Sequence, residues 1–228
     1  MLVSRVRTTA AATTAFLALT LAASPAHAAS PAKASPTKAS PARTASGVDR
    51  GVLVPAAQQP PVGEAWKTTP YVNPYFEPGV TGPGCWPYGR ATGAVDGLDA
   101  RYDTSLWFYN YNDVWVFPDS AHAESFERQW KDLLTTCVER NKPGQGTETT
   151  QYVLDVTKIE TVDDVDVWRL TTGVNGGGGT QHWQVALVRH GRAVYGMDML
   201  DYRNGTPTPI PFASTIPVIK QKLAAYYP

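Results

Sequence analysis

Cysteine and histidine are scarce in this chain of 228 residues, which has two cysteines and four histidines. The cysteines form no Cys-x-x-Cys pair, and no His-Glu-x-x-His spacing links the histidines. Zinc sites are usually recognised by such spacings, so the sequence predicts no metal site and no cofactor. A Gly-x-Ser-x-Gly nucleophile elbow is also missing, and no lysine of a phosphate-binding loop follows the glycine run at 176–179. No residue is therefore assigned a catalytic role.

An excess of positive charge is lacking as well, because the chain has 20 basic and 20 acidic residues. Six of the basic residues and one acid lie in the first 50 positions, which leaves residues 51–228 with an acidic excess of five. A nucleic-acid partner is excluded because its binding needs a basic footprint. No later apolar run approaches the roughly 20 residues of a membrane-spanning helix. We expect residues 51–228 to form a soluble monomer.

The first residues show a pattern typical of an export signal. Two arginines near the start precede an apolar run over 10–23, and Ala26-His27-Ala28 supplies a small-x-small cleavage site. We therefore expect a Sec-type signal peptide at 1–28, cleaved after Ala28, and a secreted protein that is extracellular or associated with the cell wall. The residue after the predicted cut is Ala29. A lipid anchor would require a cysteine at this position, so the sequence predicts none.

A short repeat of Ala-Ser-Pro, one further small residue and a cation follows the predicted cut and extends into a spacer at 29–50. Large apolar side chains are rare in this segment, which therefore cannot bury enough surface to offset the entropy lost on ordering. We predict a disordered spacer. Its cations could rest on anionic wall polymers, or the segment could be inert.

The aromatic residues are unevenly distributed, since 13 of the 24 lie between Trp66 and Phe117. Many fall in the proline-rich segment 51–97, which we expect to be an irregular arm on the core. Two interpretations are open: packing of the arm against the core, or a stacking surface for sugar rings or an apolar ligand. The candidate ligand-binding residues are Trp66, Tyr75, Trp86, Tyr88, Trp107 and Tyr109.

The two cysteines, Cys85 and Cys137, predict one disulfide in an oxidising compartment. The chain-entropy relation assigns such a bridge, over a loop of about 53 residues, about 4 kcal/mol. The alternatives are a metal site or a reactive thiol.

Hydrophobic periodicity predicts two main helices. The first has Asp119 or Ser120 as its N-cap and an apolar stripe of Ala123, Phe126, Trp130, Leu133 and Cys137. The second starts at about Phe212 and buries Ile216, Ile219, Leu223 and either Tyr226 or Tyr227.

Strand-forming segments surround the first helix. Residues 105–117 predict one long strand or a hairpin, and residues 152–199 predict three or four strands, with a tight turn at His190-Gly191. The acidic residues Asp163, Asp164 and Asp166 are attributed to a solvated strand edge in preference to a calcium loop. The order of elements predicts a single α+β domain over 51–228, with a twisted antiparallel sheet of five or six strands.

From Val114 to its end, the chain resembles the PknH-like extracellular sensor domain family. The pattern comprises Val116-Phe117-Pro118-Asp119 before the helix, Trp168-Arg169-Leu170 in the sheet, and the hairpin at 185–192. This resemblance implies a twisted antiparallel sheet with helices, a cleft for an unidentified ligand, and no known catalytic residues.

Three functions follow as hypotheses. The first is a secreted, non-enzymatic, sensor-like domain that binds an unidentified small ligand or a cell-wall polymer, and it predicts a cleft without a strongly perturbed carboxylate pair. The alternative is a secreted hydrolase of wall or glycan polymer, which predicts two carboxylates facing each other across a cleft, at least one with a raised pKa. A purely structural envelope protein would have no cleft and would bury Trp66, Tyr75 and Trp86.

Overall fold

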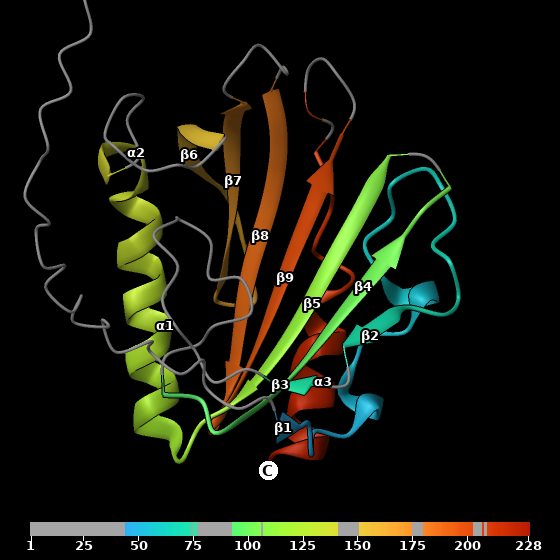
Figure 1. Ribbon diagram of the computed structural model, residues 1–228, viewed down its shortest axis with the longest axis vertical. Coiled ribbons are helices and arrows are strands. Elements are labelled where there is room, and N and C mark those ends of the chain that lie inside the picture. Colours follow the sequence, from blue (N-terminus) through green and yellow to red (C-terminus); the bar gives the residue numbers. More distant parts are fainter. Residues whose placement is uncertain are drawn as a thin grey trace, which may run out of the picture. The chain divides into compact units, whose positions relative to one another are not determined.

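A seven-stranded antiparallel sheet is the main element of this computed structural model, and its strands lie in the order β2-β4-β5-β9-β8-β7-β6 (Figure 1). The strands are β2 (Tyr71–Asn73), β4 (Asp96–Asp103), β5 (Phe108–Val116), β6 (Gln151–Val162), β7 (Val165–Val174), β8 (Thr180–His190) and β9 (Ala193–Asp201). The sheet and its helices agree with the predicted α+β class, whereas the predicted five or six strands are too few. The count was low because β4 and the short β2 lie in sequence that is polar or proline-rich and shows little strand periodicity.

The structure describes residues 44–73, 75–76, 93–105, 107–140, 151–174, 180–202, 207 and 209–228. These belong to a unit that extends over Ser40–Pro228. The predicted signal peptide lies outside the described residues, as do the candidate residues Cys85, Trp86 and Tyr88. The helices of the described part are too short or too polar to span a bilayer.

Tight turns join the strands of two hairpins. Asp163 and Asp164 connect β6 to β7, and both have positive φ angles, 45° and 68°. Two-residue hairpin turns require such angles, and aspartate adopts them more readily than most residues. The solvated strand edge expected for the three acids is therefore corrected to a turn at Asp163 and Asp164, whereas Asp166 lies in β7. Gly191, at φ 52°, opens the predicted turn between β8 and β9.

Strand β5 is continuous, so the hairpin considered for 105–117 does not form. Asn110 and Asn112, which suggested a turn, are fully buried in the ladder. The Tyr195 hydroxyl on β9 donates a hydrogen bond to Asn112 Oδ1 at 2.6 Å. Polar side chains with buried partners can thus occupy a central strand.

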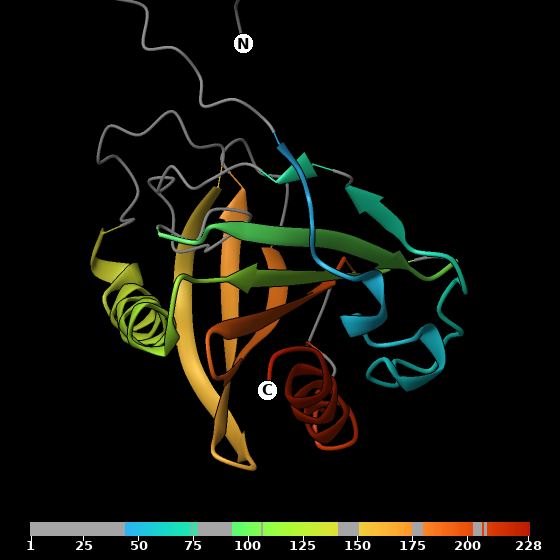
Figure 2. The same cartoon turned by 90° about the horizontal axis from the view of Figure 1, so that it is seen from below.

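The two longer helices, α1 (Ser120–Thr135) and α3 (Ile216–Tyr226), lie against opposite faces of the sheet (Figures 1 and 2). Alternation along β9 shows the division: Val194 and Leu200 join the core cluster of α1, whereas Tyr195, Met197 and Met199 join that of α3. Successive residues of a strand point to opposite faces, so one strand serves both cores. We call these two sides the α1 face and the α3 face.

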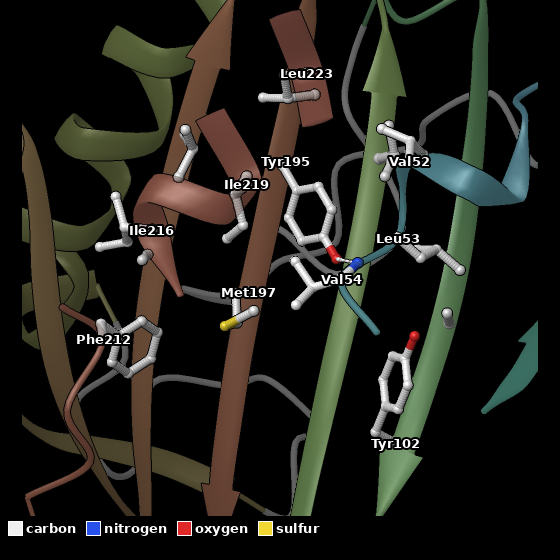
Figure 3. Close-up of a cluster of buried hydrophobic side chains, with 14 of the residues drawn as sticks. Val52, Leu53, Val54, Tyr102, Tyr195, Met197, Phe212, Ile216, Ile219 and Leu223 are labelled. Carbon is white, nitrogen blue, oxygen red and sulfur yellow. Dashed lines mark hydrogen bonds between the residues drawn. The ribbon is translucent and has the colours of Figure 1, made fainter. Parts of the chain in front are cut away.

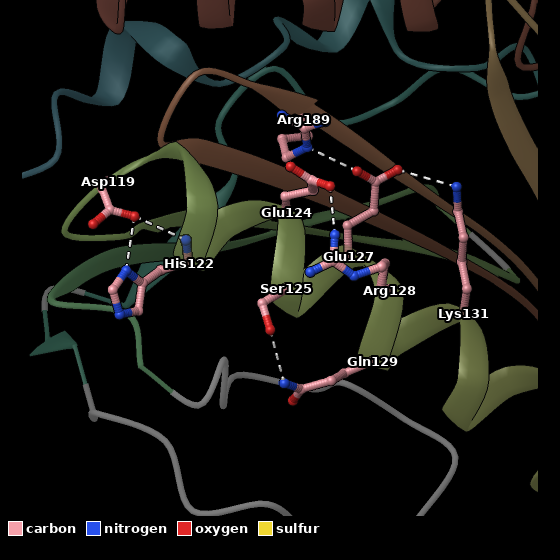
Figure 4. A network of polar contacts seen from close by, with 9 residues as sticks. All are labelled: Asp119, His122, Glu124, Ser125, Glu127, Arg128, Gln129, Lys131 and Arg189. Atoms are coloured by element: carbon pink, nitrogen blue, oxygen red, sulfur yellow. Dashed lines mark hydrogen bonds and ion pairs between the residues drawn. The ribbon is translucent and has the colours of Figure 1, made fainter.

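Helix α1 begins as predicted, with the Asp119 carboxylate accepting the backbone N–H of His122 (Figure 4). Its buried stripe contains Ala123, Phe126, Trp130 and Leu134. The predicted stripe is wrong at one position, because Leu133 is 36% exposed whereas Leu134 is 1% exposed. A helix turns 100° per residue, so the position four residues after Trp130 continues the stripe as well as the position three after it, and the sequence alone does not choose between them.

The exposed side of α1 is joined to the sheet by a carboxylate with two cationic partners (Figure 4). Glu127 accepts a hydrogen bond from Arg189 Nε at 2.8 Å and one from Lys131 Nζ at 3.1 Å. Burial opposes ionisation of Glu127, but these two bonds hold its pKa below the ordinary value.

The α3 core includes part of the segment predicted as an irregular arm (Figure 3). Val52 and Val54 are fully buried against the same cluster as Ile216 and Ile219 of α3. Val54 N–H donates to the Tyr195 hydroxyl at 3.2 Å. Two short 3₁₀ helices lie here, η1 (Arg50–Val52), which starts in the predicted spacer, and η2 (Ala56–Gln58). Strand β1 (Thr44–Ala45) pairs with β3 (Tyr75–Phe76), and Val48 is buried in this core, so the end of the predicted disordered spacer belongs to the folded domain. Packing thus orders the arm despite its weak local preferences.

Helix α3 starts at Ile216, four residues later than predicted, and Tyr227 packs on the core whereas Tyr226 is exposed.

Candidate functional site

A pocket of about 450 Å³ lies on the α3 face, between β6–β8 and the proline-rich segment that precedes α3. It is lined by Ile159, Glu160, Arg169, Gln184, Pro207, Pro209, Ile210 and Pro211. Arg169 of β7 and Gln184 of β8 are direct cross-strand partners, so the sheet places both on the floor of the pocket. The apolar residues and prolines form most of its walls.

The proline-rich wall is fastened to the sheet by two hydrogen bonds. The backbone N–H of Ile210 donates to Gln184 Oε1 at 3.2 Å, and that of Phe212 donates to Glu160 Oε1 at 3.5 Å. Proline has no N–H, so the neighbouring prolines require no such partner. The two polar side chains therefore hold the wall in place, and the pocket is preformed.

Arg169 differs from three arginines that lie in strands β4 and β8 and in helix α1. Arg101, Arg128 and Arg189 pair with the carboxylates of Asp103, Glu124 and Glu127, respectively. Within the ranges that the structure describes, the Arg169 guanidinium has neither a carboxylate nor a hydrogen-bond partner. A guanidinium carries five N–H donors and stays charged at all physiological pH values. The pocket therefore contains a cation whose hydrogen-bonding capacity is unused.

A second unusual group lies on the α1 face, away from this pocket. Asp99 of β4 is opposite Asp113 of β5, and Asp198 lies on the next strand, β9. Asp113 and Asp198 are only 3% and 2% exposed. We call these three residues the aspartate cluster.

Burial governs the protonation of the aspartate cluster. It raises the pKa of Asp198 to about 7. Burial, together with the charges of Asp99 and Asp198, raises the pKa of Asp113 well above its ordinary value. Burial also raises the pKa of Asp99, against hydrogen bonds from Asn73 and Asp113 and the charge of Arg101. These directions favour the protonated form of Asp113, which can donate a hydrogen bond to Asp99.

The predicted aromatic site residues fall in different places. Trp66 belongs to the α3 core, is 9% exposed, and donates from Nε1 to the Pro60 carbonyl at 2.9 Å. Trp107, in the connection between β4 and β5, is 49% exposed. Tyr75 contributes backbone to β3, and its side chain lies outside the described set, like Trp86 and Tyr88.

Tyr109, which is partly buried, lies beside the exposed rings of Tyr202 and Tyr71 near the β4–β5 connection. Its ring meets that of Tyr202 edge-on, with centroids 5.3 Å apart. The Arg101 guanidinium is 5.6 Å from the Tyr109 centroid and 6.0 Å from that of Tyr71. The Trp107 carbonyl accepts the backbone N–H of Tyr202 at 3.1 Å. The structure thus brings Trp107 and Tyr109, two of the six predicted residues, close to tyrosines that were not among the candidates. Ligand binding by these residues stays a prediction.

Cys137, at the start of the short helix α2 (Cys137–Arg140), is fully buried in the α1-face core. Its predicted partner, Cys85, lies outside the described residues, so the bridge stays a prediction. No three His, Cys, Asp or Glu side chains of the described part come together as a metal site.

Sequence reasoning missed the pocket and the aspartate cluster. Arg169 was noticed only as one residue of a strand, and Asp113 only as part of the segment 105–117, which predicted one long strand or a hairpin. One signal was available: Asp198 stands between Met197 and Met199 in an otherwise apolar strand. An acid in such a position is often a buried, perturbed group.

Comparison with known proteins gives a weak likeness of fold. No family model matches the chain, and no curated protein matches it. Among solved structures, it is similar to the extracellular domain of PknH from Mycobacterium tuberculosis. The two share 11% sequence identity with a TM-score of 0.43, over 71% of this chain and 84% of that one. A likeness this weak supports no conclusion about family or function, and the resemblance noted in the sequence stays a prediction.

Proposed function

We propose that this protein is an exported, non-enzymatic domain that binds a small ligand in the pocket on its α3 face. The observation that supports this proposal is the preformed cavity of about 450 Å³. Small-molecule sites have volumes of roughly 300–1,000 Å³, apolar walls and a few polar groups that orient the ligand. Ile159, Ile210 and the prolines supply such walls, and Arg169 and Gln184 supply such groups.

Export is supported by the N-terminal pattern of arginines, apolar run and small-x-small site. Of the two kinds of ligand considered from the sequence, the pocket favours the small molecule over the wall polymer. A polymer needs a long groove that contacts several of its units, whereas this cavity has a volume of only about 450 Å³.

The aspartate cluster provides part of what the hydrolase alternative requires. Asp99 and Asp113 form a carboxyl pair, and the pKa of Asp113 is raised. However, the carboxyls of a glycosidase stand about 5 Å or more apart across the sugar, whereas these two are hydrogen-bonded neighbours in one sheet. Asp113 is also almost wholly buried, and a catalytic acid must reach its substrate. Binding without turnover is therefore the better proposal.

A ligand screen on the full chain tests the proposal. Small metabolites, lipid fragments and wall fragments would be added, and binding would be followed by the rise in melting temperature and by NMR. Ile159→Trp should fill the pocket and abolish binding. Leu154→Trp changes another exposed apolar residue of β6 that does not line the pocket, and it should preserve binding.

Two results would overturn the proposal. One is a ligand that binds the Ile159→Trp and Leu154→Trp proteins equally well. The other is turnover of a wall or glycan substrate that is lost in Asp113→Asn, which would establish the hydrolase.

A further inference from the structure

We infer that the pocket selects small apolar molecules bearing a single carboxylate, which the Arg169 guanidinium binds. This inference rests on the proposed function and specifies its ligand class. It combines three features of the pocket: a cation without a carboxylate partner among the described residues, two oxygens that hold the wall, and apolar walls.

The cation is the first feature. Arg169 lines the cavity, is partly shielded from solvent, and has no carboxylate partner in the described ranges. Burying a charge without a partner is unfavourable, so a ligand that supplies the missing anion gains binding free energy there. A guanidinium binds a carboxylate through two parallel N–H···O bonds, which also orients the ligand.

The acceptors of the pocket are the second feature. Gln184 Oε1 accepts the N–H of Ile210, and Glu160 Oε1 accepts the N–H of Phe212. Both oxygens are engaged in holding the wall. Arg169 offers donors that have no carboxylate partner among the described residues, so the ligand group that matches it is an acceptor.

The walls and the local charge determine the remainder of the ligand. Ile159, Ile210 and the three prolines surround the space above the guanidinium, so the body of the ligand is apolar. The Glu160 carboxylate also lines the cavity and would repel a second negative charge. A phosphate monoester carries about −1.5 to −2 charges at neutral pH, so a monocarboxylate fits this site better.

Calorimetric titration of the full chain with three eight-carbon probes tests the inference. Octanoate should bind, and octanamide, which has the same body but no charge, should bind about tenfold more weakly or worse, because a charged hydrogen bond is lost. Octyl phosphate should also bind more weakly than octanoate.

Variants then assign the preference to Arg169. In Arg169→Gln the difference between octanoate and octanamide should disappear, whereas Arg169→Lys should keep part of it. Arg128→Gln removes the same charge from the exposed side of α1, where Arg128 pairs with Glu124, and should preserve the full preference. Circular dichroism of each variant confirms that it is folded.

The outcomes separate this inference from the proposed function. If octanamide binds as tightly as octanoate while Ile159→Trp abolishes both, the pocket binds ligands but the carboxylate inference is wrong. Three other results would also overturn the inference. They are tighter binding of octyl phosphate than of octanoate, an unchanged preference of Arg169→Gln for octanoate over octanamide, and no binding of octanoate at millimolar concentration. The proposed function fails separately, when ligands found in the screen bind to the pocket-filled variant.

Discussion

Replacing Asp198 by asparagine should stabilise the folded protein at neutral and higher pH and leave its stability in acid nearly unchanged. Asp198 is 2% exposed on β9, and burial raises its pKa to about 7 from an ordinary value of 3.8. Asparagine has the shape of the protonated side chain but cannot ionise. The variant therefore keeps the packing and removes the cost of a buried charge.

The sign of the effect follows from proton binding. Between about pH 4 and about pH 7 the folded state binds a proton at Asp198 that the unfolded state has released, so the stability of the natural protein falls as pH rises through this range. Below about pH 4 both states are protonated at this residue, and its contribution is fully present. A difference of about three pH units at about 1.4 kcal/mol each corresponds to a loss of about 4 kcal/mol above pH 7.

Neighbouring groups have perturbed pKa values too, so the comparison must be between variant and natural protein. Asp113 and Asp99 face the same side of the sheet, and their pKa values are raised as well. Their ionisation lowers the stability of both proteins, and the difference between the two curves isolates Asp198 together with its repulsion of Asp113.

Urea unfolding followed by tryptophan fluorescence, at several values between about pH 4 and about pH 8, measures this difference. The two stability curves should coincide in acid and diverge by up to about 4 kcal/mol at the upper end. Asp132→Asn, at an exposed position of α1, is the matched control and should follow the natural protein. Parallel curves for Asp198→Asn and the natural protein would refute the reasoning.

Three further predictions concern packing and the disulfide. Leu134→Ala should cost about 2–5 kcal/mol of unfolding free energy, whereas Leu133→Ala should cost about 0.5 kcal/mol or less, and urea unfolding distinguishes them. Gly196→Ala places a Cβ 2.9 Å from the indole of the facing strand β5, so it should lower stability by about 1–3 kcal/mol in the same assay. Peptide mass mapping without reductant should recover Cys85 linked to Cys137, with about 4 kcal/mol lost on reduction; a free thiol in the exported protein would contradict the bridge.

The regular elements were predictable where local pattern and packing agree. The N-cap of α1, the stripe through Trp130, the buried side of α3 and the turn at Gly191 all follow from rules that act over a few residues. The errors arose where two local solutions are nearly equal, as at Leu133 and Leu134, or where packing outweighs propensity. The polar strand β4 belongs to the second kind, because pairing with β5 makes it a strand.

The candidate site was not predictable in the same way. Arg169 and Gln184 are 15 positions apart, and the proline-rich wall is a further 25 positions along the chain. No local rule says that β7, β8 and this wall enclose a cavity. The aspartate cluster likewise joins residues from β4, β5 and β9, which meet only because the strand order places β9 beside β5.

By itself, the sequence determined the export pattern, the α+β class and the apolar sides of both main helices. Each of these depends on the order of neighbouring residues and on how much apolar surface they can bury. Only the tertiary structure decided which face each helix covers, which carboxyls have raised pKa values, and that Arg169 has no carboxylate partner among the described residues. Charges and cavities depend on distances in space, and those distances are set by strand pairing between segments far apart in the chain.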